Sequence, residues 1–285
     1  MNSASYFVQT KVYFSKIARI SIREKVWKFI LFAAIIATIV ALVTSKNMFE
    51  TFEQTKSGFF TLASACIWLG IFNSIQSICK EHDIIRLEYR QGMNLSSYIT
   101  ANVMWQAVLC MAQTVLMFVI CAIFGFFSDS PDSGVFLPAI MEYFITMYLL
   151  TFGSAVLGIM VSSLSGNPTT AMTIMPFVLI IQLVMSGVLF ELDGAADAFA
   201  NVTYSKWGMS ALGATGNINS LDYKIVLELE DQPMIVETLK DCFEAVDEYD
   251  DDIENVLGSW LACLGITLAC GGISILGLHI KNRDS

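Results

Sequence analysis

The sequence predicts an all-α integral membrane protein with six transmembrane helices. The 285 residues are 55% hydrophobic and only 15% charged, whereas average soluble domains are nearer a quarter charged. Several uninterrupted apolar runs also exceed the roughly 18 residues typical of a transmembrane helix. No stretch shows the ~10-residue alternation of a membrane barrel. The predicted spans are 27–43, 58–78, 99–127, 138–162, 170–190 and 256–280.

The distribution of Lys and Arg predicts the orientation of the chain. Eleven of the 16 basic residues lie in the segment before the first span, in the segment after the second, or in the C-terminal tail. Because basic residues are retained on the cytoplasmic side, we expect both termini to be cytoplasmic and the protein to be a multi-pass component of the plasma membrane. An even number of spans agrees with this orientation.

Two segments outside the predicted spans have distinctive compositions. Residues 1–26 carry an apolar helical face opposite basic residues, which predicts either an interfacial helix or an ordinary basic flank that fixes topology. That segment has no apolar core with a small-residue cleavage site, so we expect no cleavable signal peptide. The apolar face consists of Tyr13, Phe14, Ile17 and Ile20, and the basic residues are Lys16, Arg19 and Arg23.

The second of these segments lies between the fifth and sixth predicted spans and is strongly acidic. Residues 191–254 contain 16 Asp and Glu but only three Lys. We interpret residues 191–255 as lying outside the cell, and a solvated region is the simpler interpretation. Attraction of cationic solutes is the alternative. Cys242 lies here, whereas the other cysteines lie within spans or, for Cys79, at a cytoplasmic end; no CxxC motif or Cys/His cluster predicts a metal site.

Residues that could perform covalent chemistry are not evident. The sequence has no GxxxxGK[ST] phosphate-binding loop and no HExxH or GxSxG motif. Several amides nevertheless occur within spans, where burying polar groups is costly. We interpret them as hydrogen-bonding between helices, with a polar solute path as the alternative. They are Asn73, Gln76, Gln106, Gln113 and Gln182, and Glu142 lies near the outer end of the fourth span.

The segment "CKEHDIIRLEYRQGMNLSSY", residues 79–98, is densely charged although it separates two apolar runs. Ile85, Tyr89 and Met93 recur every four residues, which predicts a short amphipathic helix. Asp83 and Arg86 are three residues apart and can pair on its surface. Gly92 is a candidate helix stop, and Asn94 or Ser96 can cap the following span.

Three motifs together resemble the membrane subunit of type-2 ABC exporters, in particular G-subfamily-like permeases. The first lies in residues 79–98, where the resemblance rests on an acid, an Arg-x-Glu-Tyr pattern, a Gly and a Ser-Ser-Tyr. The second is "LGIMVSSLSGNPTTAMTIMPFVLIIQLVMSGVLF", residues 157–190, and the third is "ANVTYSKWGMSAL", residues 200–212. The acidic residues 216–255 depart from the family pattern and leave the substrate open.

The resemblance implies a mechanism with separate roles for several segments. ATP and Mg would be bound by an ABC ATPase on another chain, and this chain would carry no cofactor. Residues 79–98 would form a coupling helix resting on that ATPase through Glu81, Arg86, Glu88, Tyr89 and Arg90. A second permease subunit would complete a cavity lined by Cys66, Leu69, Ile180 and Leu183, closed by a hydrophobic gate at Val188 and Leu189. Lys206 and Trp207 would lie in a re-entrant segment near the outer leaflet.

Three functions are therefore compatible with the sequence. The first is an exporter subunit for an apolar or amphipathic drug, lipid or peptide, which is not an enzyme by itself. The second is an uptake permease whose acidic outer segment receives a delivered ligand. The third is a membrane sensor or scaffold without transport. The lipid bilayer is an expected partner of each, and nothing in the sequence predicts a nucleic acid partner.

Overall fold

The computed structural model describes residues 5–190, 192–221 and 246–283, which are mostly helical and contain no strand. Within these ranges, five helices are long and apolar enough to cross a membrane, and the apolar helix α7 is 17 residues long. The prediction of an all-α integral membrane protein is thereby confirmed. Cys242 and the rest of residues 222–245, within the acidic segment, lie outside the described residues.

The long helices agree with the predicted spans except at several ends. The third span was predicted to reach residue 127, but its helix ends at Ile123, and Gly125 follows with φ 78°. The fifth was predicted to reach residue 190 but ends at Val184, before Gly187 with φ 73°. Glycine adopts such left-handed conformations easily, and these are typical of helix ends. Both helices therefore end before their apolar runs do. The helices are α1 Tyr6–Arg23, α2 Trp27–Thr44, α3 Phe52–Ser74, α4 His82–Arg90, α5 Leu95–Ile123, α6 Ala139–Leu164, α7 Pro168–Val184, α8 Ala195–Ala200, α9 Tyr204–Thr215 and α12 Ile253–Arg283.

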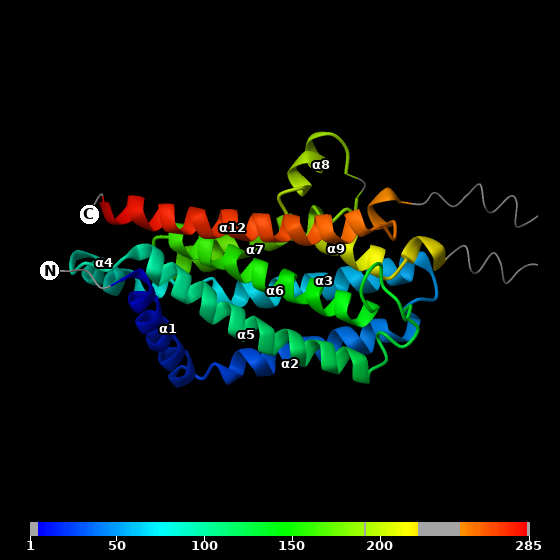
Figure 1. The fold of residues 1–285 in the computed structure, drawn as a ribbon, viewed down its shortest axis with the longest axis horizontal. Helices are drawn as coiled ribbons and strands as arrows, with labels where there is room; N and C mark the ends of the chain where they lie inside the picture. The colour runs from blue at the N-terminus through cyan, green and yellow to red at the C-terminus, as the bar shows by residue number, and fades with distance from the viewer. Residues whose placement is uncertain (1–4, 191, 222–245, 284–285) are drawn as a thin grey trace, which may run out of the picture.

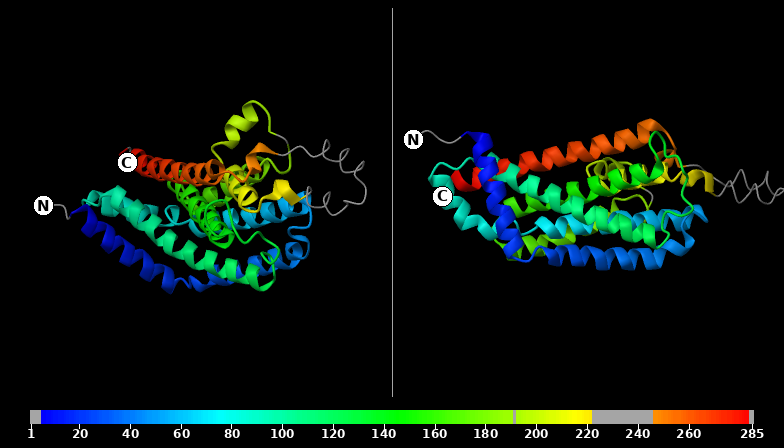
Figure 2. Two further views of the ribbon diagram at one scale, coloured as in Figure 1. Left: turned by 45° about the vertical axis from the view of Figure 1, so that its right-hand side comes forward. Right: turned by 60° about the horizontal axis from the view of Figure 1, so that its bottom comes forward.

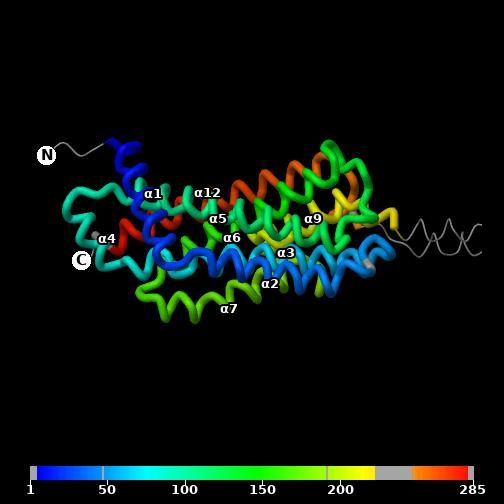
Figure 3. The backbone as a smooth tube through the Cα atoms, turned by 90° about the horizontal axis from the view of Figure 1, so that it is seen from below, coloured from blue at the N-terminus to red at the C-terminus, as the bar shows by residue number. Residues whose placement is uncertain are grey.

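Helices α2, α3, α5, α6 and α12 run side by side along the long axis of the molecule (Figure 1). The described parts of both chain ends lie at the same end of this bundle as α4 (Figures 1 and 3). Helix α1 crosses the bundle at that end and packs against α5 (Figure 2). The first and last described helices therefore reach the same end of the bundle (Figures 1 and 3), and a cytoplasmic location of that end stays a prediction.

Helices α3 and α6 form the closest pair at the centre of the bundle. A Cβ atom on Gly70 would lie 2.2 Å from the carbonyl oxygen of Thr151 and 2.1 Å from Ser154 Oγ. A Cβ atom on Gly158 would likewise lie 2.1 Å from Ser74 Oγ. Small residues thus allow the two backbones to approach closely, which is a common way of packing helices in membranes.

Helix α9 fills the bundle between α3, α6 and α12, and all its residues except Trp207 are buried. Helix α9 is only 12 residues long, shorter than the helices that surround it. The placement fits a segment that returns into the bundle from one end. Whether α9 re-enters the membrane itself stays a prediction.

Candidate coupling segment and substrate path

The segment 79–98 is not one continuous helix. A 3-10 turn at Cys79–Glu81 leads into α4, which ends at Arg90. Gly92 follows with φ 98°, and the amide of Met93 donates to the carbonyl of Glu88 at 3.1 Å, a bond typical of a glycine-terminated helix. Of the two candidate caps for the next helix, Asn94 is the one observed: its Oδ1 accepts a hydrogen bond from the Ser96 amide at 3.0 Å.

The apolar stripe of α4 faces the protein. Ile85 and Met93 are buried, and Tyr89 packs partly buried against the same cluster, which includes Ile17 of α1 and Leu278 of α12. Tyr89 also meets the ring of His279 edge to face at 6.3 Å. The stripe that predicted the helix therefore anchors α4 to the bundle and is not free to contact a partner.

Two of the three acidic residues of the segment, Glu81 and Glu88, also bind within the chain. Glu88 Oε1 accepts a hydrogen bond from the Lys16 ammonium of α1 at 2.7 Å. Glu81 accepts one from the Tyr98 hydroxyl of α5 at 2.9 Å. Burial and the Glu88 carboxylate raise the pKa of Tyr13 to about 12, so this phenol stays protonated beside the ion pair. The carboxylates thus tie α4 and the turn before it to α1 and α5.

The outward side of α4 combines apolar and charged side chains. Ile84 is 49% exposed and Leu87 is 60% exposed, and Asp83 and Arg90 are exposed beside them. Asp83 and Arg86, which were predicted to pair, form no ion pair among the described residues. Arg86 is half-buried instead. The four-residue spacing of Ile85, Tyr89 and Met93 predicted the buried side of this helix. It did not predict that apolar residues would also be exposed on the opposite side.

The turn before α4 is fixed to α6. The Ser162 hydroxyl accepts hydrogen bonds from the backbone amides of Ile78 at 3.0 Å and Cys79 at 3.1 Å. These bonds satisfy two N–H donors at the start of the 3-10 turn, where such groups have no helical partner. A movement of α4 relative to the membrane helices would therefore be transmitted to α6 as well as to α1, α5 and α12.

The residues expected to line a substrate cavity do not share one surface of this chain. Cys66 and Leu69 are buried in the core of the bundle, whereas Ile180 is exposed and Leu183 is half-buried on α7. The exposed residue at the same level of α3 is Trp68. The amphipathic spacing of α3 is too weak to distinguish these faces, because the helix is apolar all round.

The residues of the expected gate follow α7 directly. Val188 is half-buried and packs against the core, and its amide lies 3.3 Å from Ser186 Oγ. Leu189 is exposed. The left-handed Gly187 between Ser186 and Val188 turns the chain away from the helix axis.

The amides within the membrane helices mainly bind other helices. Asn73 of α3 donates to Gln113 of α5 at 2.5 Å, and Gln113 donates to the Phe29 carbonyl of α2 at 3.1 Å. Gln182 accepts hydrogen bonds from the amides of Tyr204 and Ser205 at the start of α9. For these amides, the contacts favour the interpretation that they form hydrogen bonds between helices. They do not favour the alternative that they line a polar path for a solute.

Two charged residues, Glu142 and Lys206, form hydrogen bonds and ion pairs around α9, away from the α4 end of the bundle. The buried Glu142 carboxylate accepts hydrogen bonds from the amides of Val135, Phe136 and Leu137 and from the Thr215 hydroxyl, at 2.8–3.1 Å. Lys206 of α9 forms ion pairs with Asp197 and with Glu248. Both groups therefore hold loops against α9.

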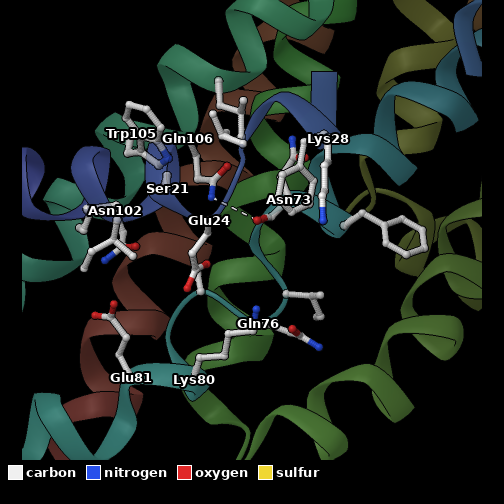
Figure 4. Close-up of a pocket in the computed structure, with 18 of the residues that line it drawn as sticks. Ser21, Glu24, Lys28, Asn73, Gln76, Lys80, Glu81, Asn102, Trp105 and Gln106 are labelled. Carbon is white, nitrogen blue, oxygen red and sulfur yellow. Dashed lines mark hydrogen bonds between the residues drawn. The ribbon is translucent and has the colours of Figure 1, made fainter. Parts of the chain in front are cut away.

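A cavity of about 860 Å³ was not predicted from the sequence. It lies between the α1–α2 connection, the end of α3, the start of α4 and α5, and polar side chains project into it from several helices (Figure 4). Its residues are distant in sequence, and those named in the sequence analysis, such as Gln106 and Glu81, were assigned there to other roles. The labelled ones are Ser21, Glu24, Lys28, Asn73, Gln76, Lys80, Glu81, Asn102, Trp105 and Gln106.

The bundle of long apolar helices, with a short charged helix bound to its end, is that of a multi-pass membrane protein. Residues 9–215 match the family model described as ABC-2 type transporter. The chain therefore belongs to the ABC-2 type transporter family. The resemblance to type-2 ABC permeases is confirmed, and the G-subfamily likeness is compatible with this match.

A relative of known description supports the same assignment. The chain is 25% identical over 157 residues to an "ABC transporter ATP-binding/permease protein" of Mycobacterium tuberculosis. The match covers 54% of this chain but only 18% of that protein. That relative joins an ATP-binding part and a permease part in one polypeptide by its description.

Proposed function

We propose that this chain is the permease subunit of an ATP-driven exporter of an apolar or amphipathic molecule, of the drug, lipid or peptide class. The single observation that carries the proposal is its match to the ABC-2 family over residues 9–215. The structure adds a bundle whose described chain ends and α4 lie together, as a cytoplasmic end would require. The plasma membrane is the proposed location, with both termini cytoplasmic.

ATP and Mg would be bound by an ATPase subunit, because this family usually works with one. We propose that this subunit is a separate polypeptide, and a fused arrangement like that of the mycobacterial relative is the alternative. The outward residues Ile84 and Leu87 would contact it, because exposed apolar side chains on a short charged helix are suited to a protein interface.

The remaining coupling residues would transmit the movement. A push on α4 would reach α1 through Glu88, α5 through Glu81 and α12 through Tyr89. Arg86 is half-buried and Arg90 is exposed, so Arg90 is the better placed to touch an ATPase. This division refines the expectation that all five residues contact the partner.

A second permease subunit would complete the substrate path. Ile180 and Leu183 on α7 would line it, with Val188 and Leu189 as the gate, and Trp68 would face it from α3. Cys66 and Leu69 would support this wall from behind, because they are buried within the chain. Few polar groups on such a wall agree with an apolar or amphipathic substrate.

Transport in inverted membrane vesicles tests the proposal. Vesicles containing this chain and its copurifying ATPase should accumulate a fluorescent amphiphile when ATP is added outside, and a variant ATPase unable to hydrolyse ATP should abolish the accumulation. Accumulation only in right-side-out vesicles energised with internal ATP would identify an uptake permease. Recovery of the chain without any ATPase and without transport would favour a sensor or scaffold.

A further inference from the structure

The cavity of about 860 Å³ at the α4 end of the bundle has a size suited to a small organic ligand. Its lining residues come mainly from α1, α2, α3 and α5, with Ile84 of α4 and Met172 of α7 in addition. The connection between α1 and α2 forms one of its walls, and there Lys25 adopts a left-handed φ of 66°. A residue other than glycine is strained in that conformation, and such strain clusters at ligand sites.

A residue of one wall carries a buried polar atom without a hydrogen-bond partner. Gln106 of α5 is only 4% exposed, and its Oε1 forms no hydrogen bond, while its Nε2 donates to the Asn73 carbonyl at a long 3.4 Å. A buried acceptor without a donor costs free energy. Because Gln106 lines the cavity, a small rotation of its amide would bring Oε1 to a donor carried by a ligand (Figure 4).

Charges of both signs surround the same space. Three lysines line it, Lys25, Lys28 and Lys80, and they form none of the ion pairs among the described residues. Two carboxylates line it as well, Glu24 and Glu81, and Glu81 already accepts a hydrogen bond from Tyr98. The lysines suit a phosphate, whereas Glu24 and the Gln106 oxygen suit an ammonium group.

The remaining walls are aromatic and lead toward the outer surface of the bundle. Phe29 and Phe32 of α2, Phe72 of α3 and Trp105 of α5 line the cavity. Phe32 is 45% exposed on the helix face that a bilayer would cover. A ligand with a zwitterionic head and an apolar tail would therefore satisfy both the polar walls and the aromatic side.

We propose that this cavity binds a phospholipid whose head group carries a primary ammonium, with the phosphate at the lysines and the ammonium at Glu24 and Gln106. The mixed charges favour a zwitterion over a purely anionic head group. Binding is independent of the proposed transport function, because it requires neither ATP nor the ATPase.

Native mass spectrometry of the purified full-length chain in neutral detergent tests this proposal. Phosphatidylethanolamine should bind at least about tenfold more tightly than phosphatidylcholine, because the choline group has a similar charge but no N–H donor, and a factor of ten corresponds to one good hydrogen bond. Soluble phosphoethanolamine should not compete at the same concentrations, because it lacks the tails that the aromatic wall contacts.

Variants separate the parts of the site. Gln106→Leu should reduce the preference for phosphatidylethanolamine to near unity, and Lys28→Gln, an exposed change that leaves the fold intact, should weaken both lipids about equally. Lys46→Gln, an exposed lysine outside the cavity, is the matched control and should change neither. Equal affinities for the two lipids, unchanged binding in Gln106→Leu, or full competition by phosphoethanolamine would each overturn the proposal.

Discussion

The ammonium of Lys16 on α1 lies 2.7 Å from the carboxylate of Glu88 on α4, although 72 residues separate them. The pair joins the first helix of the chain to the helix proposed to receive the ATPase. It also helps to explain why the segment after the second span carries both signs of charge, because Glu81 and Glu88 bind the chain's own helices. Basic residues that retain a segment in the cytoplasm explain only the positive charges.

Charge reversal tests the Lys16–Glu88 pair. Lys16→Glu places two carboxylates together and should lower the thermal unfolding midpoint of the detergent-solubilised protein, whereas Lys16→Glu with Glu88→Lys should recover most of the loss. The two side chains are 29% and 27% exposed, so we expect a coupling free energy of about 1 kcal/mol or less. A double variant no more stable than either single variant would show that the contact contributes nothing.

Close packing of α3 on α6 predicts a strong effect at Gly70. Gly70→Ala should force the helices apart, since the new Cβ would meet the Thr151 carbonyl oxygen at 2.2 Å, at a cost of roughly 1–3 kcal/mol. Gly272→Ala in α12 is the matched control, because nothing lies within 4 Å of its Cβ position. Similar thermal unfolding midpoints for the two variants would contradict the packing described for α3 and α6.

The buried Glu142 should stabilise the protein and take no part in transport. Glu142→Ala leaves the amides of Val135, Phe136 and Leu137 without their acceptor, and each such group costs about 1–3 kcal/mol. We expect a large fall in the thermal unfolding midpoint, while Met141→Ala, its exposed neighbour, changes it little. A stable Glu142→Ala variant with altered substrate selectivity would place the carboxylate on the substrate path instead.

The ion pairs of Lys206 should hold the α8 loop against α9. Lys206→Met removes the partner of both Asp197 and Glu248, and we expect faster protease cleavage between Gly194 and Val202 in the folded protein. Lys56→Met, on α3 and outside these ion pairs, should leave the cleavage rate unchanged. Equal rates in the two variants would remove the proposed role of Lys206.

Local patterns predicted the membrane helices and the short helix α4, because apolar runs and a four-residue period depend on neighbouring residues alone. The same patterns did not identify what each face contacts. Tyr13, Phe14 and Ile17 of α1 were predicted as a face for the membrane surface, but they pack with α4 and α5. In a chain this apolar, buried and lipid-facing residues have similar composition. Which face of a helix is buried is therefore decided by contacts between helices that are distant in sequence.

The site residues show the same division. Asn94 was a candidate cap from its type and position and is the cap observed. Whether Cys66 and Leu69 are buried or face a cavity depends on how α3 is rotated about its axis. That rotation is set by the close contact with α6 at Gly70 and Gly158. The cavity beside Gln106 depends on the α1–α2 connection, whose left-handed Lys25 has no marker such as glycine in the sequence.

The central claim is that α4 binds an ATPase through its outward side while its inward side holds it to the bundle. The most direct test measures the affinity of the purified ATPase for the reconstituted chain carrying Ile84→Asp and Leu87→Asp. Phe7→Asp and Val12→Asp, at exposed apolar positions on α1, form the matched control. We expect the α4 variant to remain folded and to lose at least about tenfold in affinity, with the control unchanged. Unchanged affinity in a folded α4 variant would contradict the claim.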